Sequence, residues 1–156
     1  MKNILLSILV GGIVYSQCDQ TNWQDYNPNL QDCDLSGVDF TATGTGLTNT
    51  DFTGADLSGA NLGGKNLSYA NFTEADLTGA ILSGVNSAYG TWIGANLTNA
   101  FMYDIWCAHA DISGANFSGA LLDRAWFMYA EADNETNFDG AYMCITWPTS
   151  GGGSLP

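Results

Sequence analysis

Residues 51–84 read DFTG-ADLSG-ANLGG-KNLSY-ANFTE-ADLTG-AILSG, and this stretch decides the fold. A large apolar residue, the centre of each unit, recurs every five positions, and the spacing continues without a slip from Leu47 to Ala132. Two positions before each centre stands a small residue, most often Ala, with Asp or Asn between them, and Ser or Thr and then Gly follow. A five-residue period fits neither an α-helix nor a long strand. It predicts short extended segments, each followed by a turn, with two inward residues per unit.

This A-[DN]-[LF]-[ST]-G pattern resembles the pentapeptide-repeat family over most of the chain. The resemblance implies an all-β fold, a right-handed quadrilateral β-helix of about five to six coils, with four units per coil and the central residues stacked in a dry core. Residues 20 apart would then lie about 4.8 Å apart, the spacing of neighbouring strands. The predicted central columns are Phe52/Phe72/Trp92/Ile112, Leu57/Leu77/Leu97/Phe117, Leu62/Leu82/Met102/Leu122 and Leu47/Leu67/Ser87/Cys107/Phe127.

The repeat is interrupted in two places. Leu30, Leu35 and Phe40 follow an earlier frame, so two extra residues are expected to bulge out at 43–46, and one extra residue is expected at 133–135. The last of the four columns is irregular, because Ser87 and Cys107 are centres there and Lys65 stands where Ala is usual. A lysine directed into a narrow core is unfavourable, which predicts a local distortion near Lys65.

The solenoid is predicted over residues 28–145, and segment 17–27 is predicted to cover its first coil, which would otherwise expose a β-edge. Residues 146–156 are linker-like and offer no obvious cap for the other end. Two explanations stay open: self-association at that end, or a sequence cut from a longer protein.

The first 16 residues have the pattern of a cleaved signal peptide. Lys2 precedes the apolar run from Ile4 to Val14, which is too short for a transmembrane helix, and small residues stand before Gln17. The alternatives are a buried N-terminal helix and a lipid anchor on Cys18. A cleaved signal predicts an exported protein (periplasmic, cell-surface or secreted) with no transmembrane segment after cleavage.

Export agrees with the cysteines. Cys18 and Cys33 lie before the regular repeats and are predicted to form a disulfide, whose closed loop stabilises the fold by roughly 3 kcal/mol. Neither spacing nor register places Cys107 beside Cys144.

The charge and the residue types argue against several functions. The formal net charge is −13, with 16 acidic and 3 basic side chains, so direct binding to nucleic acid is not expected. His109 is the only histidine and is expected to point away from Cys107, which leaves no catalytic constellation and no metal or cofactor site. The outward Asp residues are interpreted as hydrogen-bonding across turns.

Outward positions 20 residues apart gather apolar side chains along one edge, mainly in the C-terminal coils. The members are Tyr69, Tyr89, His109 and Tyr129, then Trp106 and Trp126, and on the adjacent face Ile81, Phe101 and Leu121. One interpretation is that stacked rings only stabilise the corner or are covered by the tail. The other is a contact surface for a second copy or another protein.

The sequence therefore predicts a non-enzymatic exported scaffold that uses its surface for protein interaction or self-association. The family resemblance supplies an alternative, because some acidic members look like B-DNA and inhibit DNA gyrase. A weaker alternative is ice binding through Thr and Ser ladders such as Ser58/Thr78/Thr98/Ser118.

Overall fold

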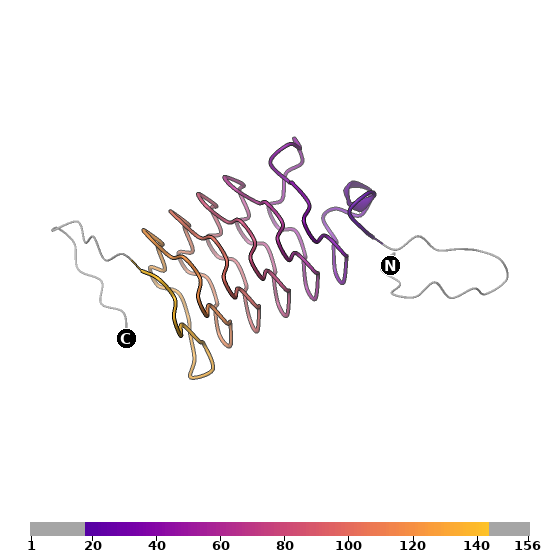
Figure 1. Cartoon of the computed structure of the whole chain (residues 1–156). Coiled ribbons are helices and arrows are strands. Elements are labelled where there is room, and N and C mark those ends of the chain that lie inside the picture. Colours follow the sequence, from indigo (N-terminus) through magenta and orange to yellow (C-terminus); the bar gives the residue numbers. More distant parts are fainter. Residues whose placement is uncertain (1–17, 144–156) are drawn as a thin grey trace.

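The computed structural model describes residues 18–143 and shows a stack of coils that runs from the N-terminal to the C-terminal end (Figure 1). The only helix among these residues is the 3-10 helix η1, Trp23–Asp25. The strands are reduced to isolated parallel bridges between residues one coil apart, as in the series Asp51↔Asn71↔Thr91↔Asp111↔Glu131. These bridges form the four sides of a right-handed quadrilateral β-helix, as the sequence predicted.

One unit shows why five residues suffice for a side and a corner. The amide of Phe52 donates to Asn71 in the next coil, and the amide of Ala55 turns back to the carbonyl of Phe52 at 3.0 Å. Gly54 lies inside this turn with φ of 66°, the left-handed conformation that a type II turn requires. The chain leaves the corner with Ala55 and Leu57 both directed into the core.

The core consists of the predicted columns. The ring of Phe72 stacks between Phe52 at 4.9 Å and Trp92 at 4.2 Å. Bridges join residues 22 apart before Leu47 and 21 apart after Glu131, instead of 20, so the inserted residues at 43–46 and 133–135 are confirmed.

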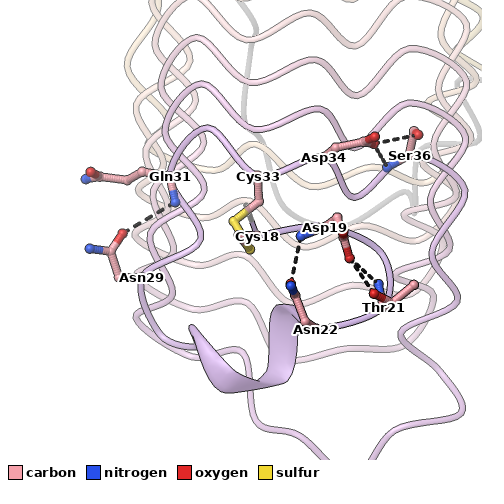
Figure 2. The surroundings of a disulfide bond; sticks show 9 residues. All are labelled: Cys18, Asp19, Thr21, Asn22, Asn29, Gln31, Cys33, Asp34 and Ser36. Carbon is pink, nitrogen blue, oxygen red and sulfur yellow. Dashed lines mark hydrogen bonds between the residues drawn. A yellow bond between two sulfur atoms is a disulfide. The ribbon is translucent and has the colours of Figure 1, made fainter. Parts of the chain in front are cut away.

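The segment before the first coil packs on its open end. Trp23 of η1 is buried and lies 4.7 Å from the ring of Phe40. Cys18 and Cys33 form the predicted disulfide (Figure 2). The carbonyl of Cys18 also accepts a hydrogen bond from the amide of Asp34. A covalent link and a strand-like hydrogen bond thus hold this segment beside the first coil.

The expected distortion at Lys65 is wrong. Its amide donates to Leu62 at 3.0 Å and its carbonyl accepts from Asn86 at 3.1 Å, as in a regular unit. The ammonium donates to the carbonyl of Thr43 at 2.6 Å. The inserted loop that contains Thr43 occupies the fourth side of the preceding coil, so the lysine reaches a backbone acceptor there without disturbing its own coil.

The irregular fourth column instead creates a polar notch in the core, formed by Ser87, Gly90 and Trp92. The hydroxyl of Ser87 and the indole nitrogen of Trp92 are buried and have no hydrogen-bond partner among the described protein groups. Gly90 stands where Ala70 and Ala110 stand in the coils below and above it. A Cβ atom at Gly90 would lie 2.5 Å from the Ser87 hydroxyl and 3.1 Å from the indole nitrogen.

Several sequence predictions concern parts of the chain outside the described residues: the signal peptide at 1–16, the tail at 146–156 and Cys144. Within 18–143, no helix combines the length and the apolar character needed to cross a membrane.

Candidate interaction surface

Tyr69, Tyr89, His109 and Tyr129 form one column at a corner of the solenoid, which we call the corner ladder. Successive ring centroids are 5.1, 4.9 and 5.0 Å apart, with interplanar angles of 6°, 3° and 21°. The coil spacing sets this distance, because the amides of Tyr69, Tyr89 and His109 each donate to a carbonyl of the coil above. All four side chains are exposed, and Tyr129 is the most exposed at 73%.

The corner ladder occupies a backbone conformation that favours glycine. Its four residues have φ between 57° and 61°, where equivalent corners carry residues such as Gly59 and Gly79. A non-glycine residue costs roughly 1–2 kcal/mol in this region, or about 4 kcal/mol and more for the four. Three stacked pairs return roughly 2–4 kcal/mol beyond the apolar area that they bury. The stacking thus offsets at least part of the backbone cost and leaves the outer edges of the rings exposed.

Beside the corner ladder, Trp106 and Trp126 stack at 5.6 Å with an angle of 28°. They occupy the outward position before the centre, where Asn66 and Asn86 stand in the earlier coils. Both indoles are exposed. Met128, which the sequence analysis missed, is also exposed on this side.

The adjacent face carries a third row. Bridges connect Ile81 to Phe101, Phe101 to Leu121, and Leu121 to Tyr142. Ile81, Phe101 and Tyr142 are exposed, whereas Leu121 is half-buried. Tyr142 is absent from the predicted 20-residue columns because the inserted residue shifts it to 21 positions after Leu121.

Tyr103 was also missed. It follows the centre Met102 and is exposed. The same 20-residue columns would have found Tyr103 and Met128 if the position after the centre had been compared. These three rows, together with Met128 and Tyr103, form what we call the aromatic surface. Its members are Tyr69, Tyr89, His109, Tyr129, Trp106, Trp126, Met128, Ile81, Phe101, Tyr103, Leu121 and Tyr142.

The aromatic surface is nearly free of acidic groups. The side that carries the corner ladder, residues 65–69, 85–89, 105–109 and 125–129, contains no Asp or Glu. The adjacent face contributes Asp104 and Asp123 to the same coils, and Asp104 pairs with Arg124 at 2.7 Å. The remaining carboxylates of these coils stand on the other two faces, and they are Asp51, Asp56, Glu74, Asp76, Asp111, Glu131, Asp133, Glu135 and Asp139.

On those two faces the polar side chains bond mainly to one another. The Oδ1 atom of Asn96 accepts from the amide and the hydroxyl of Thr98, at 3.2 and 2.6 Å. Its Nδ2 atom donates to the hydroxyl of Thr78 in the coil below at 2.9 Å. Each such hydroxyl thus both donates and accepts within the protein, which reduces what it can offer to an ice lattice.

The same turn hydrogen bonds support the interpretation of the outward acids. The Ser36 hydroxyl, together with its amide, lowers the pKa of Asp34, and the hydroxyl and amide of Thr41 lower that of Asp39. These carboxylates are bonded within their own turns. Among residues 18–143, no three His, Cys, Asp or Glu side chains are grouped for metal binding.

Cys107 and His109 diverge, as expected from their positions. The Cys107 thiol is buried, and burial raises its pKa well above the ordinary value, so it stays protonated. The His109 ring lies in the exposed corner ladder. The two side chains therefore do not form a nucleophile–base pair.

Known proteins resemble this chain in sequence and coil geometry. A family model described as pentapeptide repeats matches residues 46–86 with 8 copies. Rfr23, a pentapeptide repeat protein from the cyanobacterium Cyanothece 51142, is 26% identical over 74% of this chain and 94% of its own, with a TM-score of 0.57. A pentapeptide repeat protein from the Arabidopsis thaliana thylakoid lumen is 35% identical over 59% of this chain and 68% of its own, with a TM-score of 0.36.

The fluoroquinolone resistance protein QnrB1 is 21% identical over 72% of this chain and 58% of its own, with a TM-score of 0.39. No curated protein matches the sequence. The five-residue repeat, the bridges between coils and the similarity to Rfr23 together show that the chain belongs to the pentapeptide-repeat family.

Proposed function

We propose that this protein is an exported, non-enzymatic scaffold that binds a protein partner through the aromatic surface. The observation that carries the proposal is an exposed apolar region, three rows wide and nearly free of carboxylates, on a chain with 16 acidic residues. Exposed apolar patches of this kind mark interaction sites in soluble proteins, and aromatic residues and Met are enriched in protein interfaces.

The ring geometry favours a protein partner over a polysaccharide. A sugar ring packs on the free face of an aromatic ring, whereas the rings of Tyr89 and His109 are each covered on both faces by their neighbours. What they present outward is ring edges, which pack against apolar side chains and other ring edges.

Two features support export. The N-terminal 16 residues have the pattern of a signal peptide, and the Cys18–Cys33 disulfide is a bond that persists in oxidising compartments. Fractionation of cells that produce the protein tests this part. Full-length protein with free Cys18 and Cys33 thiols in the cytoplasm would contradict it.

Site-specific photo-cross-linking tests the binding part. A photoreactive phenylalanine at position 89 lies in the corner ladder, and the same group at position 78 lies in a polar ladder on another face as the control. Protein adducts are expected from position 89 and not from position 78. Equal adduct formation at both positions, or none at position 89, would refute the proposed surface.

The DNA-mimic alternative predicts a different result. Its one supporting observation is that most carboxylates of the regular coils gather on two adjacent faces. If purified protein inhibits supercoiling by gyrase, and if neutralising substitutions at Asp56 and Asp76 abolish that inhibition, the acidic faces and not the aromatic surface carry the function.

A further inference from the structure

Resting on the proposed function, we infer that the partner is a second copy of this chain, packed side by side on the first through the aromatic surface. The two copies are related by a two-fold axis, so each presents the same patch to the other and the assembly closes as a dimer. Three properties of the surface support this occupant: its period, its charge and its area.

The period of the surface matches a second copy. The rungs of the corner ladder are 4.9 to 5.1 Å apart, because the coil spacing fixes them. A second copy has the same spacing in either direction along its axis. The side chains of the second copy can therefore contact every ring of the corner ladder in the same relative position. A partner without this period would align with only one or two of the rings.

The charge of the chain restricts where two copies can meet. Within residues 18–143 the formal charge is −14, since Lys2 lies outside this range and its loss changes −13 by one. Acidic faces brought within about 10 Å of each other repel at ordinary salt concentrations. The aromatic surface is the side of the regular coils where the carboxylates are few, and Asp104 is already paired with Arg124.

The exposed area of the surface is of the size that a stable dimer buries. With Ile81 and Tyr142 left aside, eight large side chains of the surface are between 37% and 73% exposed, namely Tyr69, Tyr89, Phe101, Tyr103, Trp106, Trp126, Met128 and Tyr129. With roughly 200 Å² for a large aromatic side chain, they expose roughly 800 Å² in each copy. A standard stable interface buries about 800 Å² per partner.

The repeat itself supplies variants that keep the fold. Trp106→Asn with Trp126→Asn restores the residue that the repeat favours before the centre. In the same column, the Oδ1 atom of Asn86 accepts a hydrogen bond from the amide of Ala88. Tyr89→Gly with Tyr129→Gly restores the favoured corner residue and relieves a left-handed backbone. Ile93→Thr removes an exposed apolar side chain on another face and is the control.

Sedimentation equilibrium of the purified chain tests the inference. We expect a dimer whose dissociation constant rises roughly thirtyfold or more in the Trp double variant, as for hot-spot residues, rises in the Tyr double variant and stays unchanged in Ile93→Thr. Added salt is expected to preserve or tighten the dimer by screening the repulsion. Circular dichroism of each variant verifies that the coils are intact.

A protein that is monomeric at all concentrations would overturn the inference. A dimer that both double variants leave intact would also overturn it, because such a dimer must form through another surface, for example end to end. In photo-cross-linking from position 89, adducts with a different protein and no homodimer would overturn the inference and leave the proposed function standing. The absence of any adduct from position 89 would contradict both the inference and the proposed function.

Discussion

Replacing Gly90 by Ala tests whether the polar notch in the core is as tight as the structure shows. The repeat favours Ala at this position, and φ of Gly90 lies outside the left-handed region. By the repeat alone, the substitution would stabilise the protein by roughly 0.4–1 kcal/mol through a less flexible unfolded chain. The surroundings of Gly90 predict instead that the substitution destabilises the protein.

The added Cβ would meet the Ser87 hydroxyl at 2.5 Å, the Ser87 carbonyl at 3.0 Å and the Trp92 indole nitrogen at 3.1 Å. One of these neighbours is backbone and another is a large ring stacked on Phe72, so neither moves freely. Overpacking of this kind costs roughly 1–3 kcal/mol. The net expectation is a destabilisation of roughly 1–2 kcal/mol.

A double-mutant cycle with Ser87→Ala isolates the cause. This change removes the closest atom and also an unpaired buried hydroxyl, so by itself it should be nearly neutral or stabilising. Gly90→Ala should then be less damaging in the Ser87→Ala background, by roughly 1 kcal/mol. Urea unfolding followed by circular dichroism gives the four free energies. Gly46→Ala, where the new Cβ meets nothing within 4 Å, is the matched control. A Gly90→Ala protein as stable as the native one, or additive effects of the two changes, would contradict a tightly packed notch.

Replacing Cys18 and Cys33 by Ser should lower the free energy of unfolding by roughly 3 kcal/mol, for a loop of 15 residues, and dithiothreitol should destabilise the native protein but not this variant. Asn96→Asp loses the hydrogen bond to Thr78 and places a carboxylate beside Asp76, so the free energy of unfolding in urea should fall by roughly 1–2 kcal/mol. In the control Asn86→Asp, the neighbours are Asn66 below and Trp106 above, so this free energy should change little. The Cys107 thiol should resist iodoacetamide at pH 8 until the protein unfolds, because burial raises its pKa. Rapid labelling of Cys107 itself in the native protein, located by mass spectrometry of its peptide, would contradict the burial of this column.

Most of the fold was predictable because the repeat is local. A turn needs Gly or another residue that tolerates positive φ at one place, and an inward pair needs Ala and a large apolar residue two positions apart, so five residues specify a side and a corner. The two insertions followed from counting between centres, and the Cys18–Cys33 pair from its place before the regular repeats. The alignment of Tyr69, Tyr89, His109 and Tyr129 in one column likewise follows from arithmetic.

Other properties depend on atoms that the repeat brings together from different coils. The column predicted that Lys65 would disturb its coil, but the acceptor that satisfies it is a carbonyl in the loop 22 residues earlier. The repeat favours Ala at position 90, but the Ser87 hydroxyl and the Trp92 ring occupy the space. The sequence by itself thus determined the coil, its register, which residues share a face and hence which faces carry few carboxylates, because these depend on spacing along the chain. Only the tertiary structure decided how the rings stack, which polar groups remain unpaired and which acceptor Lys65 reaches, because these depend on distances between side chains in neighbouring coils.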